Sequence, residues 1–535
     1  MKGIIALSLA ALVAAAPKFS HETVHGDAAP ILSSSNAEVI PNAYIIKFKK
    51  HVSESAASDH QMWIQDIHSS RESVHLDLKK RGLVDDVFRG LKHTYKIGQN
   101  FLGYAGHFDD ETIEQVRRHP DVEYIERDSI VHTMRMEEEK IEEDAKCDSE
   151  LEKSSPWGLA RVSHRNALTF ATFNKYLYAA EGGEGVDAYI IDTGTNVDHV
   201  DFEGRAKWGK TIPQGDADVD GNGHGTHCSG TVAGKKYGVA KKANVYAVKV
   251  LRSNGSGTMS DVVAGVDWAA KSHSEQVKKA KDGKRKGFKG SVANMSLGGG
   301  KTQILDDTVD AAVDAGIHFA VAAGNDNADA CNYSPASAKK AVTVGASGID
   351  DSRTYFSNYG KCTDIFAPGL NILSTWIGSK YATNTISGTS MASPHICGLL
   401  AYYLSLQPSE DSEYSVAPIS PEKLKANLIS IATSGALTDI PKDTPNLLAW
   451  NGGGCSNYSA IVEAGGYKAE RKADKVDLSD KVSELEKLIE DDFQVISGKV
   501  VKGVSSVSDK AKKFSKKVHN MVDEELKEFL KDITA

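Results

Sequence analysis

The sequence predicts two folded domains, a small α+β domain followed by a large α/β domain with a parallel sheet flanked by helices. The first prediction rests on a β-α-β-β-α-β order of about 90 residues between residues 43 and 133. The second rests on apolar, β-rich runs that alternate with helical ones from residue 156 to residue 454. Sheets of this kind place their chemistry at the carboxyl ends of the strands.

The first 42 residues are predicted to precede the folded part of the chain. Lys2, an apolar run over residues 4–13 and three alanines at 14–16 are typical of a secretory signal peptide over residues 1–16. The run is too short to span a bilayer, and no other stretch is long and apolar enough. We therefore expect entry into the secretory route and no membrane span, with residues 17–42 as an irregular leader.

Residues 43–133 carry the pattern of a ferredoxin-like α+β domain. The second predicted helix begins with acidic residues, as a first helical turn prefers. Strands are predicted over residues 44–49, 91–96, 101–108 and 122–126, and helices over residues 53–82 and 110–118.

Residues 134–155 separate the two domains. They are highly charged and have almost no apolar periodicity, so they cannot bury enough apolar surface to fold alone. We expect an exposed linker in which a maturation cleavage falls, between residues 132 and 154.

The large domain is predicted to span residues 156–454. In its second helix, Leu305, Val309 and Ala312 share one face, and Gly316 fits a C-terminal stop. Strands are predicted over residues 186–191, 243–251, 292–297, 317–323 and 341–344, and helices over residues 259–271 and 304–315.

Residues 455–535 are predicted to form a charged, helical C-terminal extension. Two amphipathic stretches, over residues 478–489 and 510–530, follow a glycine hinge at 452–454. We expect helices that dock on the surface or stay partly disordered. The alternative is a partner helix of a coiled coil, for which the apolar stripe is too short.

Composition narrows the classes of function. A chain with 40 % hydrophobic and 25 % charged residues suits a soluble globular protein. The net charge of -9 argues against nucleic-acid binding, and we interpret the one basic run, residues 278–289, as a solvated loop.

Six cysteines are few for a chain of 535 residues, so disulfides are expected to be accessory. Cys331 and Cys362 flank a loop-rich segment and are expected to pair. Cys228 and Cys397 are predicted to be free, buried thiols. The sequence does not predict the state of Cys147 and Cys455. Asn-x-Ser sequons in expected loops predict glycosylation at Asn254, Asn332 and Asn457.

Ser390 stands where a small, turn-forming run passes into an apolar, helix-compatible stretch over residues 391–406. Unpaired N–H groups and the positive end of a helix dipole stabilise the negative charge of a serine nucleophile and of its oxyanion. The alternative interpretation is an ordinary N-cap serine. A nucleophile needs partners from elsewhere in the chain.

Two segments supply such partners. Asp192 directly follows a predicted strand, where a carboxylate can orient an imidazole. His224 lies in a glycine-rich run, and its imidazole can take a serine proton and pass it to a leaving amine. The alternative is a metal site formed by His224, His227 and Cys228, although this run lacks the Glu of the His-Glu-x-x-His zinc proteases.

Two further strand ends fit a peptide-binding cleft. Asn325 closes one of them, and its side-chain amide can donate to a developing oxyanion. The other end is glycine-rich, so its backbone can pair with an extended peptide and leave space for a substrate side chain. This second segment consists of Ser296, Leu297, Gly298 and Gly299.

Taken together, these segments resemble the subtilisin-like serine proteases. The chain order Asp, His, Ser is the subtilisin order, and residues 192–194, 224–227 and 388–392 match the three signatures of that family. The resemblance covers about residues 155–450. Residues 43–130 resemble the inhibitory prodomain of these enzymes.

Two details resemble particular branches of the family. Cys228, just after the histidine signature, is similar to the proteinase K branch. The run over residues 251–260 is similar to the fungal vacuolar protease B, or cerevisin, group. This resemblance implies a vacuolar destination, with an extracellular one as the alternative.

The resemblance also implies residue roles. Ser390 would be the nucleophile, His224 the general base and then acid, and Asp192 the residue that orients His224. Asn325 would donate to the oxyanion together with the backbone N–H of Ser390. Residues 296–299 would pair with the substrate, and the other wall of the primary pocket would be formed by Ala322, Ala323 and Gly324.

The function implied is that of a monomeric serine endopeptidase of broad specificity, made as a zymogen that its own prodomain inhibits. It would act on polypeptides and need no cofactor for its chemistry. A structural calcium ion is implied, with Asp364 as a ligand beside backbone carbonyls near Lys339 and Ala341. The competing hypotheses are a metal-dependent hydrolase and a non-catalytic binding protein on a decayed protease fold.

Overall fold

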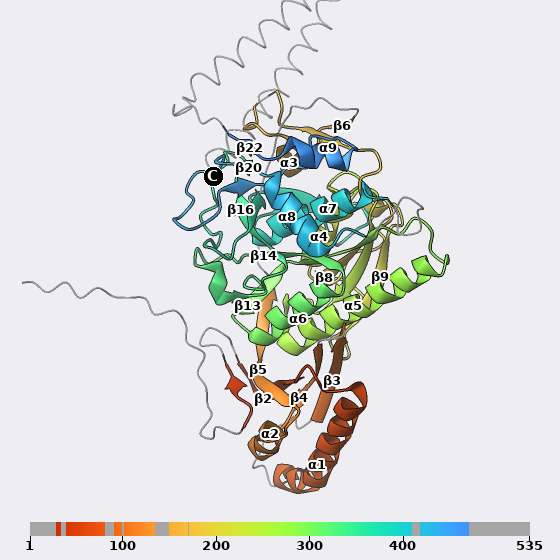
Figure 1. Ribbon diagram of the computed structural model, residues 1–535, viewed down its shortest axis with the longest axis vertical. Coiled ribbons are helices and arrows are strands. Elements are labelled where there is room, and N and C mark those ends of the chain that lie inside the picture. Colours follow the sequence, from red (N-terminus) through yellow and green to blue (C-terminus); the bar gives the residue numbers. More distant parts are fainter. Residues whose placement is uncertain are drawn as a thin grey trace, which may run out of the picture.

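The structure is a computed structural model that describes residues 28–33, 39–80, 90–98, 101–133, 149–169, 171–408 and 418–469. The small domain lies at one end of the long axis and the large domain follows it (Figure 1). The predicted signal peptide and the two predicted C-terminal helices lie outside the described residues. No helix within these ranges is long and apolar enough to cross a membrane.

The small domain has the predicted β-α-β-β-α-β order. Its strands form an antiparallel sheet in the order β5-β2-β4-β3, the order of a ferredoxin-like fold. Tyr44 and Ile46 pack under the two helices, whereas Ile45 points to the opposite face and joins the core of the large domain. The elements are β1 (Ile31–Leu32), β2 (Val39–Phe48), α1 (Glu54–Lys80), β3 (Gly90–Ile97), β4 (Phe101–His107), α2 (Asp110–Arg117) and β5 (Val122–Thr133).

The large domain is built on a 10-stranded sheet in the order β22-β20-β21-β17-β16-β14-β12-β8-β10-β9. Neighbours from β9 to β21 run parallel, as the alternation of strands and helices predicts. Its strands are β8 (Val186–Asp192), β9 (Ala206–Thr211), β10 (Asn244–Lys249), β12 (Gly290–Met295), β14 (Ile317–Ala322), β16 (Val342–Ser347), β17 (Ile365–Pro368), β20 (Thr433–Ser434), β21 (Leu447–Leu448) and β22 (Tyr467–Lys468).

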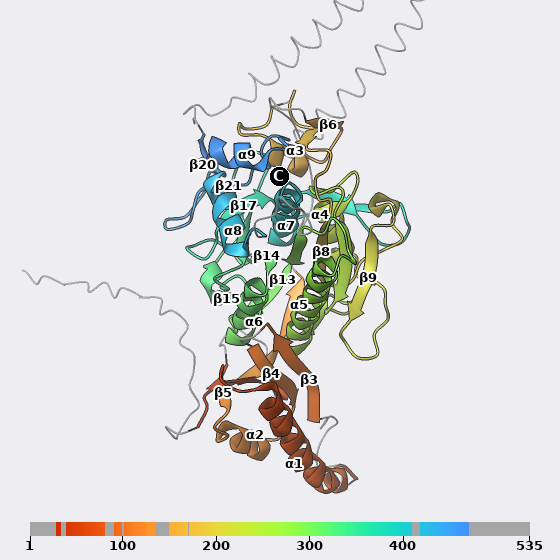
Figure 2. The same cartoon turned by 45° about the vertical axis from the view of Figure 1, so that its right-hand side comes forward.

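Helices cover both faces of this sheet (Figure 2). Alternate residues of β8 enter two cores: Ala188 and Ile190 pack with α4 and α7, and Tyr189 and Ile191 pack with α5 and α6. The helices are α3 (Trp157–Ser163), α4 (His224–Ala233), α5 (Met259–Lys281), α6 (Gln303–Asp314), α7 (Thr389–Ser405), α8 (Pro421–Ser430) and α9 (Tyr458–Ala464). The other strands are β6 (Glu150–Lys153), β7 (Lys175–Tyr178), β11 (Ser256–Thr258), β13 (Leu297–Gly300), β15 (Tyr333–Ser334), β18 (Ile372–Thr375) and β19 (Thr383–Ile386).

Two carboxylates of β5 cap helices of the large domain. Glu126 accepts hydrogen bonds from the backbone N–H groups of Gln303, at 2.9 Å, and Ile304, at 2.5 Å, in the first turn of α6. Asp128 accepts from the backbone N–H of Ser260, at 2.9 Å, in the first turn of α5. Such N–H groups have no partner within their own helix and favour negative charge. The small domain therefore completes two helix ends that would otherwise face solvent.

Three predicted boundaries need correction. The leader over residues 17–42 is not irregular throughout, because β1 pairs with β5 and β2 already begins at Val39. The linker over residues 134–155 contains β6, which pairs with β7 of the large domain. Strand β1 has only two residues and β6 is mostly charged, so neither carries a strand pattern of its own, and the backbone of a neighbouring strand supplies their hydrogen bonds.

The large domain also extends past its predicted end at residue 454. Helix α9 follows, and β22 pairs with β20 at the edge of the main sheet. Arg165 stabilises this segment: its guanidinium lies 3.5 Å from the ring centroid of Trp450 and donates to the carbonyl oxygen of Gly465 at 2.7 Å. The folded unit therefore reaches residue 469.

The basic run over residues 278–289 is only partly the solvated loop that was predicted. Helix α5 extends into this run and ends at Lys281. Arg285 donates to both carboxylate oxygens of the buried Asp187 at 2.6 Å. This paired geometry gives Arg285 a structural role within the large domain.

Candidate active site

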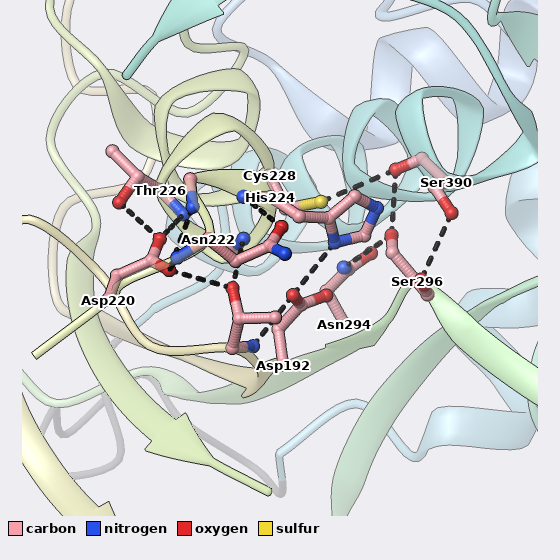
Figure 3. Close-up of polar contacts among 12 residues, drawn as sticks. Asp192, Asp220, Asn222, His224, Thr226, Cys228, Asn294, Ser296 and Ser390 are labelled. Carbon is pink, nitrogen blue, oxygen red and sulfur yellow. Dashed lines mark hydrogen bonds and ion pairs between the residues drawn. The ribbon is translucent and has the colours of Figure 1, made fainter. Parts of the chain in front are cut away.

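Asp192 and His224 are joined by a hydrogen bond. Asp192 ends β8, His224 begins α4, and both side chains are fully buried. The Nδ1 atom of His224 lies 2.8 Å from Oδ1 of Asp192, which also accepts from the backbone N–H of Thr193 at 2.7 Å (Figure 3). The carboxylate therefore holds the proton on Nδ1 and leaves Nε2 as a proton acceptor.

Asp220 builds the turn that carries His224, and the sequence analysis missed it. Its Oδ1 accepts from the hydroxyl of Thr193 at 2.9 Å and from the backbone N–H of Asn222 at 3.0 Å. Its Oδ2 accepts from the backbone N–H and the hydroxyl of Thr226 at 3.0 and 2.6 Å (Figure 3). The only signal in the sequence is an Asp at the start of the glycine-rich run.

Ser390 lies inside the first turn of α7, and Gly388 rather than Ser390 is the N-cap residue. The Oγ atom of Ser390 donates to the backbone oxygen of Ser296 at 3.0 Å. Figure 3 shows Ser390 on the side of the His224 imidazole that faces away from Asp192. The Nε2 atom of His224 is buried and has no hydrogen-bond partner among the described residues. The structure thus brings the three residues together with one of their two expected hydrogen bonds formed.

Asn325 lies beside the N-terminus of α7. Its Oδ1 atom accepts from the backbone N–H of Thr389 at 2.9 Å and from the Thr389 hydroxyl at 2.7 Å. These two bonds fix the side-chain amide and direct its Nδ2 donor away from Thr389. The arrangement places the side-chain amide of Asn325 beside the N-terminus of α7, and its role as an oxyanion donor stays a prediction.

The segment predicted to pair with a substrate is already paired with the small domain. Strand β5 runs antiparallel between β13 and β11, with Thr133 opposite Leu297 and His132 opposite Gly298. On its other side, His132 lies opposite Ser256. The sequence analysis missed β11, because three small or polar residues between turns carry no strand pattern of their own.

The segment predicted to form a wall of the primary pocket, Ala322, Ala323 and Gly324, is the exit of β14. Asn358 holds this exit: its Nδ2 donates to the carbonyl oxygen of Ala323 at 2.9 Å, and its Oδ1 accepts from the backbone N–H of Asp326 at 3.0 Å. A Cβ atom on Gly324, whose φ is +109°, would lie 2.2 Å from Nδ2 of Asn358. This exit therefore needs a glycine, and no pattern in the sequence pointed to Asn358.

Cys228 lies against the pair of Asp192 and His224 without taking part in the hydrogen bond between them. One carboxylate oxygen of Asp192, one ring nitrogen of His224 and the sulfur of Cys228 all lie within 4.8 Å of one another. The sulfur is 3.5 Å from the backbone oxygen of Ser390. Burial raises the pKa of this thiol well above its usual range, so it stays protonated.

A mercurial is expected to inhibit the enzyme through Cys228, because a mercury atom on its sulfur would displace the imidazole of His224. Inhibition should develop slowly, since the thiol is fully buried. The measurement is residual peptidase activity against time with mercuric chloride. Cys228→Ala should be resistant, and Cys397→Ala, which removes the other free buried thiol, should stay sensitive. Equal sensitivity of both variants would contradict this placement.

The alternative metal cluster of His224, His227 and Cys228 is wrong. The Nε2 atom of His227 lies 2.6 Å from the backbone oxygen of Ile372, in a hydrogen bond that occupies it. The groups that do lie together are Asp192, His224 and Cys228, and two of these already share a hydrogen bond.

The expectation of calcium at Asp364 does not fit the residues present. The ammonium of Lys425 lies 2.8 Å from Oδ2 of Asp364 and 2.6 Å from the carbonyl oxygen of Ala341. It also reaches the carbonyl oxygen of Lys339 at 3.2 Å. A side-chain cation therefore takes the place of the metal ion. Lys425 could not be predicted as the partner of Asp364, because the two residues are 61 positions apart in the chain.

The disulfide predicted between Cys331 and Cys362 is present. Cys228 and Cys397 are free and buried, as expected, and Cys455 is disulfide-bonded. Asn254 and Asn457 are exposed and Asn332 is half-buried, so glycosylation at these positions remains a prediction.

A buried Asp–His pair beside a serine at a helix N-terminus, on a parallel sheet, defines a serine protease of the subtilisin kind. The chain belongs to the Subtilase family, Peptidase S8, which matches residues 183–452. The peptidase inhibitor I9 family matches residues 43–134. The predicted fold class, the protease activity and the inhibitory prodomain are thereby confirmed.

The chain is similar to two named relatives and to one solved structure. The chain is 75 % identical to the subtilisin-like proteinase Spm1 of Pyricularia oryzae, over 99 % of each chain. It is 64 % identical to alkaline protease 2 of Aspergillus fumigatus, over 94 % of this chain and 99 % of the relative. A crystal structure of a cold adapted subtilisin-like serine proteinase is 42 % identical, with a TM-score of 0.48, over 56 % of this chain and 99 % of the other.

Proposed function

We propose that Ser390 is the nucleophile of a broad-specificity endopeptidase, with His224 as general base and Asp192 as the residue that positions it. The observation that carries this assignment is the buried Nε2 atom of His224, unpartnered on the side where Ser390 lies. In the zymogen the Ser390 hydroxyl donates to Ser296. Attack on a substrate requires that bond to be exchanged for one to Nε2, and catalytic hydrogen bonds often tighten only when substrate binds.

The reaction is an acyl transfer in two halves. The Oγ atom of Ser390 adds to the scissile carbonyl carbon while its proton moves to Nε2 of His224. The carbonyl oxygen becomes an oxyanion, which accepts from Nδ2 of Asn325 and the backbone N–H of Ser390. His224 then gives its proton to the leaving amine as the C–N bond breaks. Water repeats the sequence on the acyl-enzyme, releasing the acid and restoring Ser390.

Reagents distinguish this chemistry from that of a metal hydrolase. A phosphonyl reagent directed at serine should abolish peptidase activity, because it forms a bond to the Ser390 oxygen. A zinc chelator should leave activity unchanged. The reverse pattern would rule out the serine mechanism.

The prodomain inhibits by filling the cleft. Strand β5 occupies the position between β11 and β13 that an extended substrate would take, and the carboxylates of Glu126 and Asp128 anchor it to two helices. Both partners of each contact belong to the same chain, so no second copy is needed. This fits a monomeric zymogen. Polypeptides are the substrates that such a strand-shaped cleft would accept.

The first maturation cut is expected at the bond between Met134 and Arg135. Thr133 is the last described residue of β5 and lies opposite Leu297, and the carbonyl oxygen of Ser296, the residue before Leu297, is 3.0 Å from the Ser390 hydroxyl. We therefore expect the bond that follows the next residue of the prodomain to be the one attacked. N-terminal sequencing of the earliest processed product tests this, with Arg135 as the expected first residue. A first product that begins before Val131, or beyond Glu137, would contradict the register.

The proposal for the destination of the enzyme rests on its sequence. The signal-peptide pattern over residues 1–16 supports the secretory route. We infer a vacuolar location from the resemblance of residues 251–260, with secretion from the cell as the alternative.

A further inference from the structure

The cluster around Lys425 lies where strands of the main sheet begin, at the opposite end of the strands from the active site. Asp364 directly precedes β17, and Ala341 directly precedes β16, so both stand at strand beginnings. Asp192 instead stands at the end of β8, and His224 and Ser390 stand in the first turns of α4 and α7. Changes at this cluster can therefore be made without touching the catalytic residues.

The ammonium of Lys425 satisfies all its donors within this cluster. It donates to the carbonyl oxygens of Lys339, at 3.2 Å, and Ala341, at 2.6 Å, and to Oδ2 of Asp364, at 2.8 Å. An ammonium group has three N–H donors, so none is left over. Oδ2 of Asp364 also accepts from the backbone N–H of Thr343 at 2.8 Å, which fixes the carboxylate.

These oxygens form a cation site that a calcium ion cannot share with the lysine. Calcium binds six to eight oxygens at about 2.3–2.6 Å. The ammonium stands in contact with the same three oxygens and adds a positive charge that repels a second cation. Its side chain is 17 % exposed and that of Asp364 is 22 % exposed, so solvent screens this repulsion only in part.

We propose that Lys425 is a built-in cation that replaces a metal ion and holds α8 to the beginnings of β16 and β17 without calcium. The helix positions the ammonium, since Leu424 and Leu428 on either side of Lys425 are buried in the core of the large domain. The attachment of α8 to the sheet then depends on Lys425 and is independent of the calcium concentration. A second consequence is that removal of the ammonium exposes a latent calcium site.

Calcium titration of lysine variants tests the proposal. The full-length chain carrying Ser390→Ala serves as the parent, because it cannot digest itself. Calorimetric titration with calcium chloride should show one more binding event in Lys425→Ala than in the parent. Calcium should also raise the Tm of Lys425→Ala by about 2–4 °C more than that of the parent. In EDTA, Lys425→Ala should unfold at a lower temperature than the parent.

Two controls separate the cluster from any other calcium site. Lys425→Ala combined with Asp364→Ala should lose the added binding event, because the carboxylate is gone. The parent and its Asp364→Asn variant should bind equal numbers of calcium ions. A binding event that the parent has and Asp364→Asn lacks would overturn the proposal, even if Lys425→Ala fails to fold. A folded Lys425→Ala variant with no added event would overturn it as well.

Discussion

Ser390→Ala is expected to lower kcat by about 10⁶-fold, the loss found when the nucleophile of a subtilisin is removed. The variant keeps the binding strands and the oxyanion donors but has no oxygen to form the acyl-enzyme. Turnover of a chromogenic peptide measures the effect, once added wild-type enzyme has removed the prodomain of the variant and has itself been separated from it. The prodomain should also remain uncut in this variant, because the maturation cut uses the same nucleophile. Both losses should appear together.

Ser393→Ala is the matched control for this experiment. Ser393 lies one turn further along α7, and its hydroxyl donates to Asn294 rather than to a catalytic group. The variant should mature and keep kcat within about tenfold of the wild type, at some cost in stability, because a buried hydrogen bond is lost. A Ser390→Ala chain that still removes its own prodomain would contradict the assignment.

Asp192→Asn is expected to lower kcat by about 10⁴-fold, as the equivalent change does in a serine protease of another fold. The amide can present a donor to Nδ1 of His224, which favours the tautomer with its proton on Nε2. That tautomer cannot accept the serine proton. The measurement is kcat/KM over a pH series, with KM expected to change much less than kcat.

Asp187→Asn provides the matched control on the same strand. Asp187 is also buried in β8, but it pairs with Arg285 at the beginning of the strand. Its replacement should lower Tm and leave kcat unchanged, since it breaks a structural ion pair far from the chemistry. A similar fall in kcat for both variants would mean that Asp192 acts only through stability.

The main secondary structure could be predicted because the long elements carry strong periodicity. Leu305, Val309 and Ala312 line the buried face of α6 as their spacing predicts, and β8 is buried throughout. The catalytic candidates were found because each chemical group stands at a strand end or a helix beginning.

The elements that were missed depend on contacts between distant parts of the chain. Strand β11 pairs with β5, and β6 pairs with β7. Backbone hydrogen bonds to the partner strand form these strands, and the local sequence has no pattern that predicts them. Asp220 and Asn358 act through hydrogen bonds to backbone groups, which residue type alone cannot reveal. Lys425 lies on a helix whose pattern indicates an exposed lysine, and only the fold brings it to Asp364.

Peptide mapping after labelling with a fluorophosphonate tests the central claim most directly, which is that Asp192, His224 and Ser390 act as one unit. The processed enzyme should carry a single adduct on Ser390, and the labelling rate should fall by orders of magnitude in His224→Ala whose prodomain has been removed by added wild-type enzyme. An adduct on another residue, or a rate that does not depend on His224, would contradict the account.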